Sequence, residues 1–277
     1  PGELWEVLAR PSQRLRAGTM VILPGGEQVV MERLVGEGRW IVSVPRSTSG
    51  VSLMERYGRL PLPPYIKTYA ARASAYQTVY ARRPGSAAAP TAGLHFTRAL
   101  LSRLETAGVR RVYVTLHVGL DTFQPIREPV VEQHAIHQED FFVTAAAIKT
   151  LREVRKTGGR VVAVGTTSAR VLETLAQQET LFAEDKVGDL RGSTSIYITP
   201  GYRFRAVDVL LTNLHLPRST VLAMTMAFAG VERLRAAYAE AVALRYRFFS
   251  FGDAMLIESL TVGPLTRGGE GPGGAHA

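Results

Sequence analysis

A proline-rich segment at residues 60–66 most strongly constrains how this chain can fold. Its sequence, LPLPPYI, contains three prolines. Each proline lacks a backbone N–H donor and fixes φ, and a residue before proline avoids the helical region, so this segment cannot form a helix. We expect an extended linker here, with one domain at residues 1–60 and a second at residues 61–265.

The sequence pattern of the residues before the linker is typical of a small β domain. Short β-rich runs, separated by glycine-containing turns, cover residues 5–8, 20–23, 28–34 and 40–44. They predict part of a small antiparallel sheet or barrel. The chain starts at Pro1 with a strand already in progress, so we expect further residues upstream and a barrel that is incomplete at its N-terminus.

The residues after the linker alternate between helical and strand patterns. Helical patterns cover residues 97–107, 144–156, 168–176 and 219–245, and strand patterns cover residues 111–116, 160–164, 194–198 and 207–211. This alternation predicts an α/β domain with a parallel or mixed sheet. The glycine-rich residues 266–277 predict a disordered tail.

Composition narrows the functional classes. The chain has no cysteine, which excludes disulfides, cysteine-bound zinc and thiol catalysis. It has no membrane-span or signal-peptide pattern, so a cytoplasmic location is the default. The 33 lysines and arginines against 24 acidic residues give a formal charge of +9, which favours polyanions such as nucleic acid as partners.

Three residues are candidates for proton transfer. His95 lies in the block PTAGLHFT, just before a helix whose N-cap is predicted at Thr97. It could act as a base, a hydrogen-bond donor to substrate or a cap. His117 and Asp121 follow the strand at residues 112–116, where open α/β sheets build their sites. The alternative is a histidine that is satisfied by a loop carbonyl.

The block VVAVGTTSAR predicts an anion site. A buried strand, a turn at Gly165 and the hydroxyls of Thr166 and Thr167 precede a helix that carries Arg170. Free N–H groups at such a turn can bind a carboxylate or phosphate. The alternative is an ordinary strand-to-helix connection with Thr166 or Thr167 as N-cap. No G-x-G-x-x-G fingerprint occurs, which disfavours a dinucleotide or methyltransferase Rossmann site.

Three more segments carry candidate contacts. Tyr202, Arg203 and Phe204 interleave rings and charge, a combination that stacks bases and neutralises phosphates, although an ordinary turn at residues 200–201 explains them too. Asn213 and His215 end a strand, and Asp253 is an acid in an apolar context that needs a partner. His134 and His137 are a weak zinc signal, so we predict no metal.

Together these blocks resemble one family, the S-adenosylmethionine:tRNA ribosyltransferase-isomerases of queuosine biosynthesis. The resemblance runs from residue 5 to residue 257 and is carried by PTAGLHFT, TLHVGLDTF, EQHAIH, VVAVGTTSARVLE, ITPGYRF, DVLLTNLHLPRSTVLAM and YRFFSFGDAMLI. It implies a large three-layer α/β domain with a small antiparallel β-barrel domain. Family members begin earlier than this chain, and they commonly have glycine at the position of Asp121.

The resemblance also implies a reaction. The ribosyl moiety of S-adenosylmethionine is transferred to the aminomethyl group of a 7-deazaguanine at the wobble position of a tRNA anticodon loop. Isomerisation gives epoxyqueuosine, and adenine and methionine leave. S-adenosylmethionine is consumed as a ribosyl donor, and a monomeric enzyme without a metal is implied.

By the same resemblance, His95 and His117 are expected to accept and donate the protons of the reaction, and Asp121 is expected to orient one of the two histidines. The substrate-binding residues are taken from the matching blocks and their neighbours: Thr91, Phe96, Thr115, Gly165, Thr166, Thr167, Arg170, Tyr202, Arg203, Phe204, Asn213, His215 and Asp253.

Two alternatives stay open. A non-catalytic tRNA-binding remnant would bind tRNA with a steep salt dependence but release no adenine. An ordinary methyltransferase would release S-adenosylhomocysteine.

Overall fold

The chain divides into two compact units, Pro1–Pro61 and Leu62–Ala277. The computed structural model describes residues 2–36, 38–59, 62–63, 65–66, 73–119, 126, 128–134, 136–181 and 188–259. The tail predicted at residues 266–277 lies outside this set. No helix in the described part is long and apolar enough to cross a membrane.

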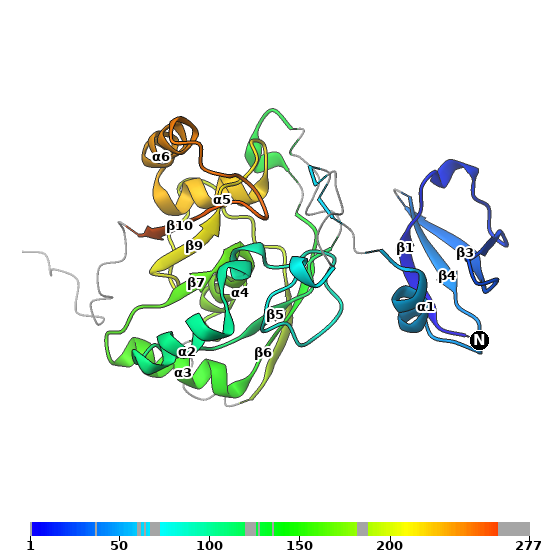
Figure 1. The fold of residues 1–277 in the computed structure, drawn as a ribbon, viewed down its shortest axis with the longest axis horizontal. Helices are drawn as coiled ribbons and strands as arrows, with labels where there is room; N and C mark the ends of the chain where they lie inside the picture. Colours follow the sequence, from blue (N-terminus) through cyan, green and yellow to red (C-terminus); the bar gives the residue numbers. More distant parts are fainter. Residues whose placement is uncertain are drawn as a thin grey trace, which may run out of the picture. The chain divides into compact units, whose positions relative to one another are not determined.

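The small unit is built on one antiparallel sheet (Figure 1). Its strands are β1 (Leu4–Leu8), β2 (Met20–Ile22), β3 (Gln28–Gly36) and β4 (Arg39–Ser43), in the order β1-β4-β3-β2. The four predicted β runs are therefore confirmed. Over the described residues the sheet does not close on itself, so the predicted barrel is not confirmed.

A small apolar core and one unpredicted helix complete this unit. Met31, Trp40 and Val42 are buried, and the Trp40 indole N–H donates to the Ser12 hydroxyl at 2.9 Å. Helix α1 (Gly50–Tyr57) is capped by Ser49, whose side chain accepts from the Ser52 N–H. A Cβ at Gly50 would overlap the indole of Trp5, so glycine permits the helix to start against that ring.

Over the described residues, the large unit contains two three-stranded sheets, one of mixed direction and one antiparallel (Figure 1). One has the order β10-β9-β7, in which β7 (Val162–Val164) runs parallel to β9 (Val209–Asn213) and β10 (Ala254–Glu258) runs antiparallel. The other is antiparallel, with β6 (Glu139–Val143) between β5 (Val114–Leu116) and β8 (Leu190–Thr194). The mixed α/β prediction is confirmed at this level.

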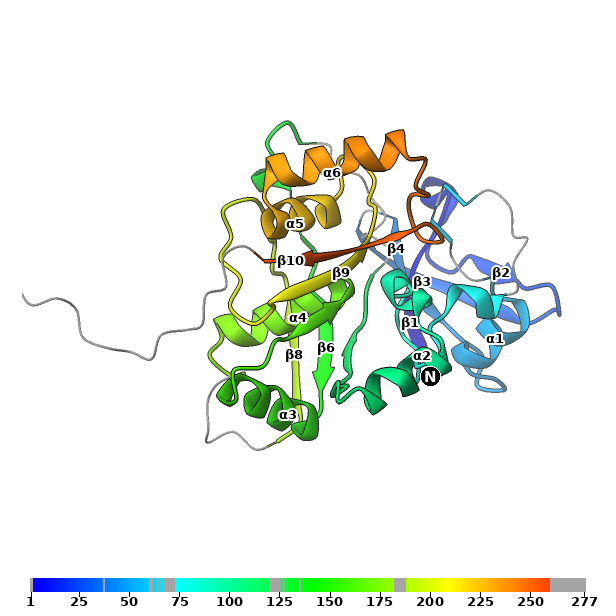
Figure 2. The ribbon, with the colours of Figure 1, turned by 60° about the vertical axis from the view of Figure 1, so that its left-hand side comes forward.

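Helix α4 (Gly165–Gln177) is the centre of the large unit. It contacts β7 and β9 of one sheet and β5 and β8 of the other. Its Ala169, Val171 and Leu175 are at most 1% exposed, so the main apolar core forms around it. Figure 2 shows α5 (Thr220–Ala229) and α6 (Val231–Ala243) on the opposite side of the β10-β9-β7 sheet from α4.

The remaining helices confirm the sequence patterns at residues 97–107 and 144–156. Helix α2 covers Arg98–Thr106 and helix α3 covers Ala145–Lys156. The predicted N-cap is confirmed, because the Thr97 hydroxyl accepts from the Leu100 N–H at 3.1 Å. Short 3-10 turns are also present among the described residues: η1 (Ser12–Arg14), η2 (Ala73–Tyr76), η3 (Thr91–His95) and η5 (Val131–Gln133).

Several boundaries in the large unit differ from the sequence prediction, and two of the differences have a local cause. The strand expected at residues 194–198 is β8 at Leu190–Thr194, because the Thr194 hydroxyl accepts from the Ile196 N–H and turns the backbone out of the ladder. Helix α4 starts at Gly165, three residues before the predicted start, and the residue before it is Val164. The alternative of Thr166 or Thr167 as N-cap is therefore wrong.

A buried carboxylate ties the loop before β9 to α4. Glu173 is 0% exposed and accepts hydrogen bonds from the backbone N–H groups of residues 205–207 at 2.9–3.0 Å. The Tyr202 hydroxyl donates to the same carboxylate at 3.0 Å. Burial raises the pKa of Glu173, and the four donors oppose that shift. The loop's backbone N–H groups are thus satisfied by one side chain of the central helix.

We predict that Glu173→Gln destabilises the protein by about 1–3 kcal/mol, because an amide N–H₂ would face donors that a carboxylate accepts. Urea unfolding of the variant measures this loss. Glu153→Gln is the matched control, since Glu153 forms an exposed pair with Arg110 that we expect to contribute less than about 1 kcal/mol. Equal stability of Glu173→Gln and the wild type would contradict the anchoring role.

Candidate active site

The candidate site lies at the carboxyl ends of β7 and β9. These strands are parallel, so Val164 and Asn213 end at the same edge of the sheet, which is where open α/β sheets place ligands. The 3-10 helix η3 (Thr91–His95) contacts β9 and α4 here. This edge gathers seven of the residues that the sequence singled out: Thr91, His95, Gly165, Thr166, Thr167, Asn213 and Asp253.

A hydrogen-bond chain fixes His95 at this edge. The Thr91 hydroxyl donates to the Asn213 side-chain carbonyl at 2.9 Å, and the Asn213 amide nitrogen lies 3.4 Å from His95 Nε2. Asn213 is 2% exposed, whereas the His95 ring is exposed. A buried amide therefore positions an imidazole that solvent can reach.

Asp253 lies beside this chain. It precedes β10, whose first residue, Ala254, pairs with Asn213. Its carboxylate accepts from the guanidinium and the backbone N–H of Arg247, each at 2.8 Å. These bonds hold the pKa of Asp253 below its usual range, and the nearby His95 adds a smaller lowering effect. Asp253 thus has Arg247 as its partner and is an ionised acid close to His95.

The turn into α4 completes the edge. Gly165 has φ +85°, a left-handed conformation that favours glycine, and a Cβ there would lie 3.8 Å from the Ala92 side chain in η3. No side chain caps this end of α4. In the part of the chain that the structure describes, its first N–H groups, at Gly165, Thr166 and Thr167, therefore have no side-chain acceptor at the site edge. Their proposed anion contact stays a prediction.

His215 is held for structural reasons. Its Nε2 lies 2.7 Å from the Thr212 hydroxyl, and its backbone N–H donates to the Tyr238 hydroxyl at 2.8 Å. Burial lowers the pKa of His215 to about 4, so its ring is neutral at neutral pH. A neutral, hydrogen-bonded ring suits positioning more than proton transfer.

His117 occupies a different place, beyond the end of β5. Its backbone N–H donates to the Asp140 carbonyl at 2.8 Å, and a Cβ at Gly85 would lie 2.8 Å from its Nδ1. That Nδ1 is buried and has no hydrogen-bond partner in the described part of the chain. No described hydrogen bond joins the ring to His95. Asp121 lies outside the described residues, and Thr115 lies within β5.

Several other candidates are engaged in packing. Arg170 forms an ion pair with the buried Glu139 of β6. The Tyr202 ring packs edge-on against Phe204, which is 9% exposed and packs in turn on Phe228. These contacts give all three a structural role, and their contact with substrate stays a prediction. Arg203 is exposed, and Phe96 follows η3 and is partly buried.

Two residues of this region were not predicted from the sequence. Arg247 is six residues before Asp253 in the block YRFFSFGD, and only the turn between them brings the two together. Tyr80 packs so closely on η3 that a Cβ at Gly93 would overlap its hydroxyl. Burial raises the pKa of Tyr80 to about 12. Arg247 lies within the block YRFFSFGDAMLI, but nothing in that block marks it as the partner of Asp253, and Tyr80 lies outside the blocks that carry the resemblance.

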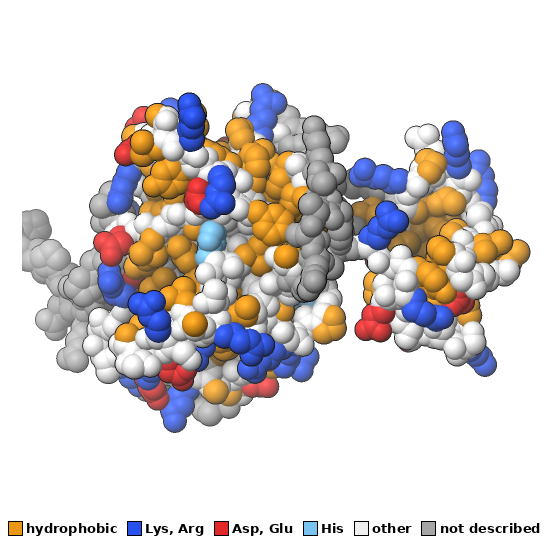
Figure 3. Space-filling view, in the orientation of Figure 1, with side chains coloured by type: hydrophobic (Ala, Val, Ile, Leu, Met, Phe, Trp, Pro, Cys, Tyr) orange, Lys and Arg blue, Asp and Glu red, His pale blue; other side chains and the backbone are white. Residues whose placement is uncertain are grey.

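The surface of the large unit carries hydrophobic and charged side chains close together. Figure 3 shows a face of the large unit on which a histidine lies among hydrophobic side chains, beside acidic and basic ones. Among the residues that the structure describes, no group of three or more His, Cys, Asp or Glu side chains could hold a metal ion.

His215 makes the stability of the protein depend on pH. Its pKa is about 4 when folded and about 6.5 when unfolded, so the unfolded state binds the proton more readily. We therefore expect the free energy of unfolding to fall by up to about 3 kcal/mol as pH decreases from about 6.5 to about 4. Urea unfolding across this range measures the loss. His215→Gln should flatten the pH dependence, and an unchanged slope in that variant would contradict the assignment.

Comparison with known proteins places the chain in a family. A family profile described as "Queuosine biosynthesis protein" matches residues 2–257. The S-adenosylmethionine:tRNA ribosyltransferase-isomerase of a Thermoanaerobacter species is 46% identical over 255 residues, covering 91% of this chain and 73% of the relative. That of Rubrobacter xylanophilus is 50% identical over 256 residues, covering 92% and 72%.

A solved structure is also similar. The S-adenosylmethionine tRNA ribosyltransferase of Thermotoga maritima is 34% identical, with 92% of this chain and 70% of that one covered and a TM-score of 0.49. The profile and the curated relatives each match most of the chain. The chain belongs to the S-adenosylmethionine:tRNA ribosyltransferase-isomerase family of queuosine biosynthesis.

Proposed function

We propose that this chain transfers and isomerises the ribosyl moiety of S-adenosylmethionine onto the 7-aminomethyl-7-deazaguanine base of tRNA. The product is epoxyqueuosine-tRNA, and adenine and methionine are released. The observation that carries the proposal is the identity of 46% and 50% to enzymes of this name over more than nine-tenths of the chain. Such coverage argues against a non-catalytic tRNA-binding remnant.

The reaction needs a base and an acid. The positive sulfonium makes the protons on the adjacent ribose carbon removable, and the departing adenine needs a proton. We assign His95 and His117 to these two transfers. His95 is supported by its exposure at the sheet edge and by its contact with the buried Asn213, because an imidazole can either donate or accept a proton. Asp121 is proposed to orient the His117 ring.

The other groups bind and orient. The N–H groups at Gly165, Thr166 and Thr167 suit the methionine carboxylate, since a helix N-terminus attracts anions. Arg170 is proposed to support this contact from its pair with Glu139. A second set of side chains is proposed to surround the adenine, the ribose and the deazaguanine: Thr91, Phe96, Thr115, Asn213, His215 and Asp253.

Tyr202, Arg203 and Phe204 are proposed to contact the anticodon loop, and the exposure of Arg203 makes it the group best placed to reach a phosphate. The formal charge of +9 supports tRNA as the partner. We further propose a cytoplasmic monomer that needs no metal. The antiparallel sheet of the small unit is proposed to be part of a β-barrel.

Incubation with S-adenosylmethionine and tRNA that carries the aminomethyl-deazaguanine base tests the function. We expect free adenine and a modified nucleoside of the mass of epoxyqueuosine. S-adenosylhomocysteine instead of adenine would identify a methyltransferase. Bound tRNA without adenine release would identify the non-catalytic alternative.

We predict that His95→Gln lowers kcat by about 10²–10⁴-fold, the usual contribution of a general acid or base. The initial rate of adenine release at saturating substrates measures kcat. His276→Gln is the matched control, because it removes a histidine beyond the residues that match the family, and we expect wild-type kcat. A His95→Gln variant with wild-type kcat would remove His95 from the proton transfers.

A further inference from the structure

Two guanidinium groups cover one outward-facing ring in the antiparallel sheet of the large unit. Phe141 and Val143 of β6 point into the core, so Phe142 between them points to the opposite face. The Arg83 guanidinium lies 3.9 Å from the centre of the Phe142 ring, and that of Arg191 lies 4.8 Å from it. Phe142 is only 8% exposed.

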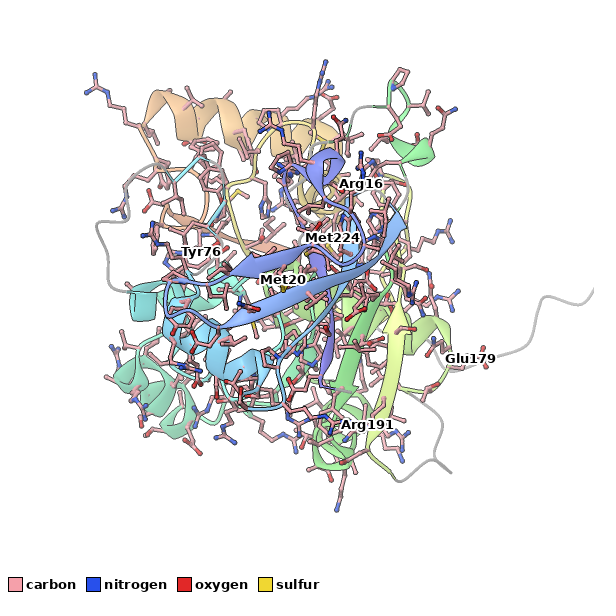
Figure 4. The ribbon with its side chains drawn as sticks, turned by 90° about the vertical axis from the view of Figure 1, so that its right-hand side faces the viewer. Arg16, Met20, Tyr76, Glu179, Arg191 and Met224 are labelled. Atoms are coloured by element: carbon pink, nitrogen blue, oxygen red, sulfur yellow. The ribbon has the colours of Figure 1, made fainter. Side chains whose placement is uncertain are left out.

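Different parts of the chain supply the two arginines. Arg191 lies on the edge strand β8 directly opposite Phe142 in the ladder, and Figure 4 labels it there. Arg83 comes from the loop before η3. Both residues are exposed. A second pair continues this surface, because the guanidinium of Arg82 lies 5.9 Å from the ring centre of Tyr113, which is 43% exposed.

We call Arg82, Arg83, Tyr113, Phe142 and Arg191 the arginine-aromatic surface. None of its three arginines forms an ion pair with a described acidic residue. The neighbouring Arg110 and Arg111 differ, since they pair with Glu153 and Glu105 at 2.8 and 2.5 Å. Two cations share one ring without a counter-ion among the described residues, and a bound anion would relieve their repulsion.

The stacking leaves the arginines ready to bind. A guanidinium that packs its face on a ring still directs its N–H edges outward, and these edges fit phosphate oxygens in pairs. Tyr113 adds an exposed ring on which a base can stack. Basic side chains interleaved with aromatic ones are the features with which proteins hold single-stranded RNA loops.

This surface is connected to the candidate active site. Tyr80 packs on η3 at Gly93, and its ring centre lies 5.6 Å from that of Tyr113. The loop that carries Arg82 and Arg83 continues to Ser86, whose hydroxyl accepts from the Val118 N–H next to His117. An RNA strand that crosses the arginine-aromatic surface therefore approaches the residues assigned to proton transfer.

We infer that the arginine-aromatic surface binds the phosphate backbone of the tRNA beside the modified base. This inference rests on the proposed function for the identity of the RNA. It assigns backbone binding to Arg83 and Arg191 and base stacking to Tyr113. These residues lie outside the segment at Tyr202, Arg203 and Phe204.

The double variant Arg83→Met/Arg191→Met tests the inference, because methionine keeps an apolar cover on Phe142 and removes both charges. We expect tRNA binding, measured by fluorescence anisotropy at increasing salt, to weaken by roughly tenfold. The slope of log Kd against log salt should decrease by about 0.7 for each phosphate that the variant no longer neutralises. The KM for S-adenosylmethionine and the melting temperature should stay at wild-type values.

Arg235→Gln is the matched control, since it removes an exposed charge that is paired with Glu232. Wild-type affinity and slope in the double variant would overturn the inference. Loss of adenine release by the double variant at saturating tRNA would also overturn the inference, because it would show that the two arginines act in the reaction itself. The binding measurement does not require turnover. Failure of the wild type to release adenine would therefore contradict the proposed function but not the inference about tRNA binding.

Discussion

The parallel pairing of β7 with β9, and the immediate start of α4 after β7, is the constraint on which the rest of the large unit depends. The two strands end at one edge, and the chain turns into α4 at Gly165 without an intervening loop. The left-handed φ of Gly165 makes this turn possible, and Ala92 lies against it. A side chain there would strain the backbone that positions both α4 and η3.

Helix α4 packs against both sheets and so fixes their positions relative to this turn. Its apolar side chains fill the core between them, and its buried Glu173 holds the loop that leads into β9. The same helix carries Arg170, which pairs with Glu139 of the second sheet. Charged side chains are costly to bury unless they are paired or hydrogen-bonded, and here each one is engaged with a distant segment. They therefore specify which segments meet.

The sequence predicted the elements with strong local signals and missed those decided by distant partners. Thr97 gave the start of α2 correctly, because an N-cap acts within one turn of helix. Strands β6 and β10 were missed, and both are completed by neighbours that come from distant parts of the sequence. Position 173 looks like one more polar residue of a helix, and nothing local reveals that three backbone N–H groups converge on it.

The same difference between local signals and distant partners decides which residues of the candidate site could be predicted. His95, Asn213 and Thr91 could be selected from their blocks because each lies next to the end of a regular element. The contribution of Arg247 could not be foreseen, since it depends on the turn that closes before Asp253. The pairing of Tyr80 with η3 could not be foreseen either. Yet this contact links η3, which carries His95, to the exposed ring of Tyr113 and the arginine beside it. In the proposed reaction such a link is needed, because a base would have to reach His95 while the RNA backbone is held at the arginine-aromatic surface.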